Sequence, residues 1–149
     1  MAAETVILAD EMMQRDRASR LLGMTVIERS AGRAVVRMTV TPDMTNGFSI
    51  THGGFVFALA DTAFAIACNS GENLTVAAGA DITFLKPTRA GDELTATAGL
   101  RASSGRSGLY DVEIVDGGGD IVAEFRGRSR TTPQTLASLD ATTTTEVER

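Results

Sequence analysis

The stretch from residue 46 to residue 69 holds the residue types that could do chemistry. Its sequence is NGFSITHGGFVFALADTAFAIACN, and it contains the only histidine, His52, directly before Gly53 and Gly54. A glycine pair that opens a helix exposes backbone N–H groups and lets a ligand approach closely. Asp61 follows within an apolar run, where a carboxylate has a raised pKa and can act as a base. The segment therefore offers a donor for a developing anion together with a candidate base.

Each candidate also has a structural interpretation. The glycine pair could permit close packing of a helix on a sheet, and His52 could be a satisfied structural histidine. Asn46 precedes a glycine, as in an ordinary turn. Asp61 could be a partly exposed helix residue, or its carboxylate could bond to the hydroxyl of Thr62. The sequence alone leaves these alternatives open.

The spacing of Gly53 and Asp61 limits how they could act together. The two residues are eight positions apart, which places them about 12 Å apart along one helix. A reacting carbon must lie about 3 Å from both the oxyanion donor and the attacking oxygen. One helix therefore cannot supply both groups, but two helices that run antiparallel across a two-fold axis can. The simplest solution is a homodimer with two composite sites.

Composition narrows the class of protein. A chain of 149 residues fits one domain. Its net charge of -5 argues against a general nucleic-acid binder. The single cysteine cannot form an intrachain disulfide. One cysteine and one histidine alone cannot build a tetrahedral zinc site, so we expect no metal. Cys68 is predicted to be a small core residue near the end of a helix.

Two features of the chain bear on its location. The N-terminus contains acidic residues and shows no long apolar segment of the kind found in secretory signals, so a cytoplasmic location is predicted. The apolar run from Gly53 to Cys68 covers 16 residues. A membrane-spanning helix needs roughly 18 to 20 residues, so a buried core helix is the better interpretation.

Hydrophobic periodicity predicts the elements that must position these residues. A helix is expected over residues 3–22, with Gly23 as its stop, and a buried helix over 53–69. Alternation with a period of two predicts strands over 33–40, 74–85, 93–101, 109–115 and 121–129. Short turn-rich links between them indicate antiparallel hairpins.

These elements predict an α+β fold in which an antiparallel sheet wraps around one buried helix. Residues 1–131 form the single predicted domain. Residues 132–149 show neither period and are expected to be a flexible tail.

At the motifs of the central segment the sequence resembles a known family. The strings Asn46-Gly47, His52-Gly53-Gly54 and Leu59-Ala60-Asp61-Thr62-Ala63 are similar to the PaaI-type acyl-CoA thioesterases of phenylacetate degradation, which belong to the hotdog-fold superfamily. Further matches are Gly91 to Ala96 and Gly108 to Ile114, and the resemblance covers roughly residues 10 to 130. It implies a five- or six-stranded antiparallel sheet around a long central helix. It also implies dimers that pair into homotetramers, and a reaction without metal or organic cofactor.

The resemblance assigns roles to individual residues. It implies that Asp61 is the catalytic carboxylate and that the amide of Gly53 polarises the substrate carbonyl. His52 and Asn46 would help to orient the thioester, and Thr62 would steady Asp61 or the water. The substrates implied are aryl-acyl-CoA esters, with hydroxylated phenylacetyl-CoA typical of the family.

The resemblance also predicts where coenzyme A could bind. Gly54 would lie at the thioester, and the basic side chains of Lys86, Arg89 and Arg106, with Ser107 beside the last, could meet the nucleotide phosphates. Each of these charges could instead be an ordinary solvated surface group.

Two other functions stay open on the sequence alone. A dehydratase or hydratase of the same fold would yield an enoyl product without free thiol. A non-catalytic acyl-CoA-binding protein would bind the ester and release no free thiol.

Overall fold

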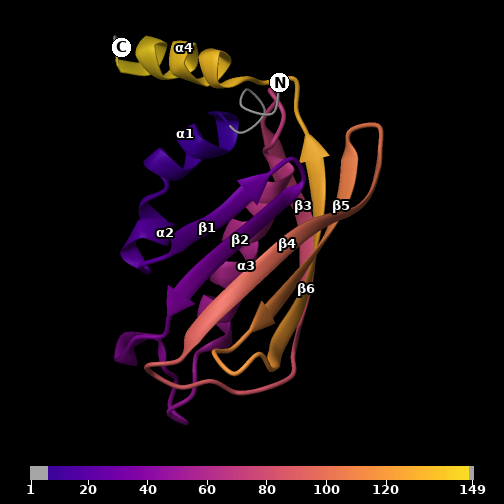
Figure 1. The fold of residues 1–149 in the computed structure, drawn as a ribbon. Coiled ribbons are helices and arrows are strands. Elements are labelled where there is room, and N and C mark those ends of the chain that lie inside the picture. The colour runs from indigo at the N-terminus through magenta and orange to yellow at the C-terminus, as the bar shows by residue number, and fades with distance from the viewer. Residues whose placement is uncertain (1–6, 148–149) are drawn as a thin grey trace.

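One antiparallel sheet curves around a single long helix in the computed structural model, which describes residues 7–147 (Figure 1). The helix is α3 (Gly53–Cys68). The strands follow the spatial order β1-β2-β4-β5-β6-β3, and every neighbouring pair is antiparallel. Their bounds are β1 (Thr25–Ser30), β2 (Arg33–Thr39), β3 (Thr75–Phe84), β4 (Glu93–Ser104), β5 (Ser107–Val115) and β6 (Ile121–Thr131). This arrangement confirms the predicted α+β class and the buried central helix.

The strands β2 to β6 occupy the five predicted ranges, with ends that differ by a few residues. The sequence pattern does not predict β1. Along β1 only Val26 is partly buried, and the other residues are exposed. The strand therefore lacks the alternation that marks a packed face, and its pairing with β2 is what defines it.

The core lies between the sheet and α3, which packs mainly against β2 and β4. Leu94 and Ala98 of β4 are fully buried because they alternate toward the helix. Phe64 of α3 meets Tyr110 of β5 edge-on, with ring centroids 5.5 Å apart. A Cβ atom on Gly127 of β6 would lie 2.7 Å from the Phe64 ring. Glycine at this strand position therefore makes room for the helix.

A buried asparagine fixes the C-terminal end of α3. The side chain of Asn69 donates to the carbonyl oxygens of Ala65, at 2.8 Å, and Thr75, at 3.0 Å. It also accepts a bond of 2.9 Å from the N–H of Thr75. These bonds satisfy a carbonyl at the helix end and join it to the first residue of β3. Cys68 is buried just before Asn69, as predicted.

The N-terminal helix differs from the prediction. Residues 3–6 of the predicted range lie outside the described residues, and the rest forms two helices, α1 (Ile7–Arg15) and α2 (Arg17–Leu21). A single helix is wrong because Asp16 takes an extended conformation and caps α2 through the N–H of Ser19. The predicted stop is correct, since Gly23 has a φ of +69° just after α2.

The strand β3 forms one edge of the sheet, and β6 is its only neighbour in the described chain. The sequence predicts one packed face that includes Val76, Ala80, Ile82 and Phe84. Ala80 and Ile82 do pack against the core, but Val76 and Phe84 are 51% and 53% exposed. A register shift in the first half of β3 turns Val76 out of the packed face.

A fourth helix, α4 (Leu136–Val147), lies in the C-terminal segment. The sequence pattern does not predict α4, because the run of threonines in this helix has weak helix propensity and no clear apolar stripe. Arg15 of α1 forms an ion pair of 3.0 Å with Asp140 of α4. This pair joins the first and last described helices, which lie near each other in Figure 1.

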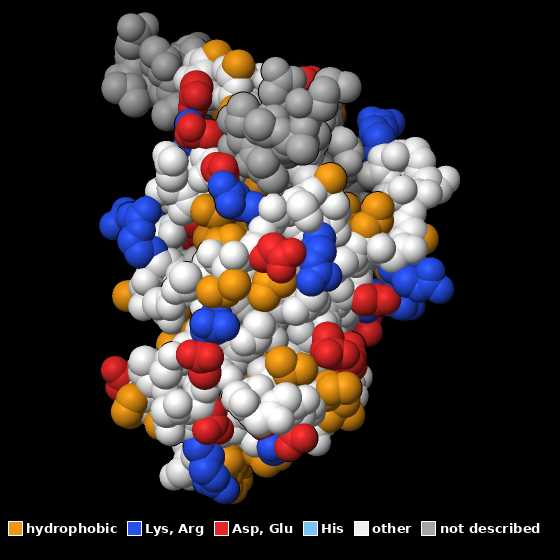
Figure 2. Space-filling model, viewed as in Figure 1, with side chains coloured by type: hydrophobic (Ala, Val, Ile, Leu, Met, Phe, Trp, Pro, Cys, Tyr) orange, Lys and Arg blue, Asp and Glu red, His pale blue; other side chains and the backbone are white. Residues whose placement is uncertain are grey.

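Acidic and basic side chains are interspersed over the face drawn in Figure 2. The net charge of -5 is therefore not gathered into one field on this face. Within residues 7–147, no helix combines the length and apolar character needed to cross a membrane.

Candidate active site

A cleft of about 520 Å³ opens beside the first turn of α3. Three residues predicted for the site, Asn46, Gly53 and Lys86, line it. Much of the remaining lining is apolar and includes Val56 of α3 and Phe84 at the end of β3. The structure therefore brings part of the predicted site together around an apolar cavity.

The loop before α3 is held by its own hydrogen bonds. The Oδ1 atom of Asn46 accepts from the N–H groups of Phe48, at 2.9 Å, and Ile50, at 3.4 Å. The hydroxyls of Thr51 and Thr88 lie 2.7 Å apart and are buried. The turn interpretation of Asn46 is thus correct, and the same turn places this residue at the cleft.

The start of α3 explains the order of the histidine and the two glycines. His52 is the N-cap residue, and its Nδ1 accepts a bond of 3.0 Å from the N–H of Gly54. Gly53 is the first residue of the helix, so its N–H has no acceptor inside the helix and gains positive potential from the helix dipole. A Cβ atom on Gly53 would lie 2.9 Å from Cζ of Phe84. Glycine therefore lets this ring lie against the backbone beside the donor.

Asp61 lies two turns further along α3 and is half-buried. Burial raises the pKa of its carboxyl above the ordinary value, and the nearby charge of Asp16 raises it further. The hydroxyl of Thr62 lies 2.9 Å from that of Ser19, so its partner in this structure is Ser19 and the predicted alternative of a bond to Asp61 is not seen. Asp61 does not line the cleft at Gly53, in agreement with the spacing argument.

The two basic residues near the cleft already have partners. Lys86 lies 2.5 Å from Asp116 and 2.8 Å from Asp120. Hydrogen bonds to these carboxylates raise the pKa of the Lys86 ammonium. Arg89 donates to the carbonyl oxygen of Ser49 at 3.3 Å. A phosphate at Lys86 would have to compete with two carboxylates.

Arg106 lies in the turn between β4 and β5 and Ser107 is the first residue of β5, at the opposite end of the subunit from the start of α3 (Figure 1). The hydroxyl of Ser107 accepts a bond of 3.2 Å from Arg130. Within one chain these residues are therefore not part of the cleft at Gly53. The structure thus distributes the predicted site over three places along the length of α3.

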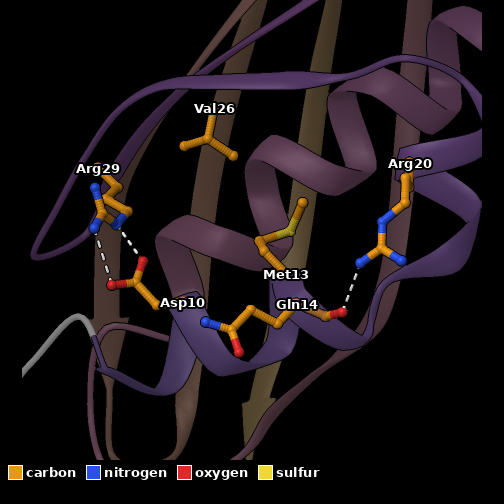
Figure 3. Close-up of a pocket in the computed structure, with 6 residues that line it drawn as sticks. All are labelled: Asp10, Met13, Gln14, Arg20, Val26 and Arg29. Carbon is orange, nitrogen blue, oxygen red and sulfur yellow. Dashed lines mark hydrogen bonds and ion pairs between the residues drawn. The ribbon is translucent and has the colours of Figure 1, made fainter.

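A second cavity of about 520 Å³ lies between α1, α2 and β1 (Figure 3). Its charged groups are paired, because Arg29 binds the carboxylate of Asp10 through two nitrogens, and Arg20 donates to the carbonyl of Gln14. The one carboxylate among the labelled side chains, Asp10, is held by Arg29. This cavity therefore offers fewer groups that could take part in a reaction than the cleft at Gly53.

Sequence reasoning missed three residues near the predicted site. Ser19 contacts Thr62 through its hydroxyl, Asp16 accepts a bond from that same hydroxyl, and Phe84 covers Gly53. The sequence signal at Asp16 is that of a helix cap, which does not indicate that the capped residue, Ser19, contacts a residue more than 40 positions away. The alternation of its strand assigns Phe84 to the packed face instead.

Comparison with known proteins identifies the family. Residues 48–123 match the Thioesterase superfamily. Over 121 residues the chain is 49% identical to acyl-coenzyme A thioesterase PaaI of Escherichia coli (strain K12), which covers 81% of this chain and 86% of that protein. The chain belongs to the thioesterase superfamily. A putative esterase of Archaeoglobus fulgidus is 32% identical and covers 79% of this chain and 77% of the relative.

Solved structures agree with this assignment. The E. coli PaaI protein from the phenylacetic acid degradation operon superposes with a TM-score of 0.86 and 45% identity, covering 90% of this chain and 97% of that chain. A mutant of phenylacetic acid degradation protein PaaI from Thermus thermophilus gives 0.75 at 36% identity, covering 78% and 100%. The predicted resemblance and the hotdog fold are therefore confirmed.

Proposed function

We propose that this protein is an acyl-CoA thioesterase that hydrolyses aryl-acyl-CoA esters, of the phenylacetyl or hydroxyphenylacetyl type, to the free acid and coenzyme A. The observation that carries the proposal is the pair of groups on α3. The amide of Gly53 opens the helix at a cleft, and Asp61 is a half-buried carboxylate of raised pKa. Thioester hydrolysis needs such a donor and such a base. The 49% identity to an acyl-coenzyme A thioesterase supports the same reaction.

The reaction follows from these groups. The thioester carbonyl oxygen accepts a hydrogen bond from the N–H of Gly53, with His52 and Asn46 orienting the ester beside it. Asp61 of a second copy removes a proton from the attacking water, or attacks the carbonyl carbon itself. The C–S bond then breaks, and coenzyme A leaves as a thiolate, which needs no strong acid. No step calls for a metal or organic cofactor, and the proposed location is the cytoplasm.

The edge strand β3 supports a homodimer. It has strand-pairing groups on its outer side, and apolar side chains such as Val76, Phe84 and Leu85 are about half exposed along or beside it. An exposed edge with apolar side chains is suited to pairing with another strand. Antiparallel pairing of two β3 strands would form an isologous dimer and run the two α3 helices in opposite directions. Gly53 of one copy could then face Asp61 of the other.

The cleft lining supports an apolar acyl group. Ile50, Val56, Leu85 and Val122 provide apolar surface, and the ring of Phe84 could stack on an aryl group.

We propose that Arg89, Arg106 and Ser107, which are exposed, bind the phosphates of coenzyme A. Arg89 lies beside the cleft, whereas Arg106 and Ser107 lie where β4 connects to β5. Gly54 would leave room for the thioester. Lys86 is the weakest of the predicted contacts because Asp116 and Asp120 neutralise it.

Asp61→Asn tests the proposal directly. The amide keeps the size of the side chain but cannot take a proton, so kcat should fall by about 10²–10⁴-fold. Release of free coenzyme A from phenylacetyl-CoA measures turnover, and circular dichroism checks the fold. Unchanged hydrolysis in this variant would refute the assignment. For the wild-type protein, conversion of a 3-hydroxyacyl-CoA to an enoyl-CoA and water without free thiol would indicate the dehydratase.

Gly53→Pro tests the other half of the site. Proline removes the N–H yet suits the first position of a helix, and the extended φ and ψ of His52, -61° and 129°, suit a residue before proline. Gly53→Ala is the matched control, since it adds a Cβ atom but keeps the donor. Proline should reduce kcat far more than alanine does.

Mixed dimers test the sharing of the site. Co-expression of differently tagged Asp61→Asn and Gly53→Pro chains, followed by two-tag purification, isolates assemblies that contain mixed dimers. One of the two sites of each mixed dimer is then native, so roughly a quarter to a half of the wild-type specific activity should return. Mixed dimers as inactive as the two parents would contradict a shared site.

A further inference from the structure

A hydrogen-bonded chain of three residues runs from the start of α2 to α3. The Oδ2 atom of Asp16 lies 2.6 Å from the hydroxyl of Ser19, and that hydroxyl lies 2.9 Å from the hydroxyl of Thr62. The Oδ1 atom of Asp16 accepts a further bond of 2.9 Å from the N–H of Ser19. Ser19 is 3% exposed, so bulk water does not compete for its bonds. The last member of the chain, Thr62, directly follows Asp61.

Counting protons fixes the direction of this chain. An ionised carboxylate can only accept hydrogen bonds, so Ser19 must donate its single proton to Asp16. The bond between Ser19 and Thr62 then needs a proton from Thr62. The oxygen of Thr62 is left with lone pairs only, and it can accept a hydrogen bond but cannot donate one to Asp61.

We propose that Asp16 and Ser19 are positioning residues for the reaction centre, because they fix as a hydrogen-bond acceptor the hydroxyl of Thr62, the residue that directly follows Asp61 on α3. This inference rests on the proposed function, in which Asp61 is the catalytic carboxylate. A donor beside Asp61 would stabilise its ionised form and weaken it as a base. An acceptor avoids that loss, and it can take the second O–H of a water that gives its first proton to Asp61. The arrangement therefore favours water attack assisted by a base over direct attack by the carboxylate.

The charges around Asp61 are few. Asp16 contributes from the junction of α1 and α2. The Cys68 thiol of α3, whose pKa burial and the Asp61 charge raise to about 12, stays neutral and contributes no charge. The strand faces that pack on α3 contribute apolar core residues. The remaining charged groups of α1 and α2 have other partners or are exposed. Asp10 pairs with Arg29, and Arg15 pairs with Asp140 and also feels the charge of Glu11. Arg20 donates to the Gln14 carbonyl, and Arg17 is exposed. Asp16 is therefore the charge whose removal should be felt most at Asp61.

Asp16→Asn reverses the chain while keeping the helix cap. Its Oδ1 can still cap Ser19, but its Nδ2 would donate to the Ser19 hydroxyl, which would then donate to Thr62 and free the Thr62 proton for Asp61. The loss of the Asp16 charge acts in the same direction. We expect the acidic limb of the kcat/KM profile against pH to move down by about half a pH unit or more. Asp111→Asn is the matched control, because it removes a carboxylate from the outer face of β5 and should leave the limb in place.

A pair of variants at position 62 tests the acceptor itself. Thr62→Val keeps the shape but removes the hydroxyl, so kcat should fall by about tenfold with KM little changed. Thr62→Ser keeps the hydroxyl and should restore most of kcat. This pair also decides the matter if Asp16→Asn does not fold.

The outcomes separate this inference from the proposed function. If Asp61→Asn stops turnover while Asp16→Asn keeps the wild-type limb and Thr62→Val keeps the wild-type kcat, the inference fails and the proposed function stands. A lowered melting temperature with an unmoved limb would show a merely structural role and would also overturn it. A ¹³C NMR titration of the Asp61 carboxyl in wild type and Asp16→Asn needs no turnover. A lower pKa in the variant supports the inference, and an equal pKa contradicts it.

Discussion

At the scale of single residues, Asp61 is a carboxylate kept where ionisation is unfavourable. Its position on α3 is half-buried, and burial is the main reason that its pKa is raised. Because the folded state binds the proton more tightly than the unfolded chain does, stability falls as pH rises through the raised pKa. Above the raised pKa this loss is complete, so Asp61 opposes folding in the ionised form in which it would act as a base.

Asp61→Asn should therefore stabilise the protein while it abolishes turnover. At pH 7 we expect the melting temperature to rise by about 2–4 °C, the change that roughly 1 kcal/mol produces in a chain of this size. The difference should shrink as pH falls and vanish below about pH 3, where the aspartate is protonated in both states. Calorimetry at one protein concentration across about pH 2.5 to 8 measures this, and a lower melting temperature at pH 7 would contradict it.

Individual roles could be predicted from the sequence only where the signal is local. The turn at Asn46 and the helix start at Gly53 are encoded by neighbouring residues, and both are present. The pairing of Lys86 with Asp116 depends on a contact across 30 positions, and the contact of Ser19 with Thr62 spans 43. Such contacts follow from the packing of the sheet and helices, so periodicity could not reveal them.

At the scale of elements, the contact between α3 and β3 depends on one buried side chain. Asn69 is 4% exposed and forms three bonds that link the end of the helix to both backbone groups of Thr75. Loss of this amide would leave buried backbone groups without partners, which is more costly than the loss of a single exposed hydrogen bond.

Asn69→Ala should lower the free energy of unfolding by about 2–4 kcal/mol. Asn73→Ala is the control, because Asn73 is less buried and donates one side-chain bond, of 3.0 Å, to Thr132. Its effect should be about 1 kcal/mol. Urea unfolding followed by circular dichroism compares the two variants. Equal losses of unfolding free energy would show that the bonds of Asn69 have no special role in joining α3 to β3.

Elements could be predicted where one face is buried, because the buried residues then recur with a regular period in the sequence. The strands β2, β4, β5 and β6 alternate between buried and more exposed residues, and α3 is a long apolar run; all five lie at the predicted ranges. The edge strand β1 has no packed face, and α4 has a weak pattern. Asp16 divides the N-terminal helix because it caps a new one, which a window averaged over 20 residues cannot resolve.

At the scale of the whole molecule, the two edges of the sheet offer a matched test of assembly. Val76 on β3 and Ile27 on β1 are similarly exposed, at 51% and 46%. Only β3 adjoins the cleft through Phe84. If the dimer forms along β3, only one of the two edges should be sensitive to an added charge.

Val76→Glu should dissociate the protein toward monomers and remove its activity, since each site would lose its second half. Ile27→Glu should keep both the wild-type mass and the wild-type turnover. Light scattering measures the mass against a 15.6 kDa chain, and the family resemblance predicts four chains for the wild type. A Val76→Glu protein that retains full mass and activity would contradict pairing through β3.

The single sulfhydryl of the chain has a practical consequence. Cys68 is buried, and burial raises the pKa of its thiol to about 12. Aromatic disulfide reagents react with thiolates and hardly at all with protonated, enclosed sulfur. A colorimetric reagent of that kind should therefore count only the sulfur set free from the substrate, so that hydrolysis can be followed continuously with the enzyme left unmodified in the cuvette.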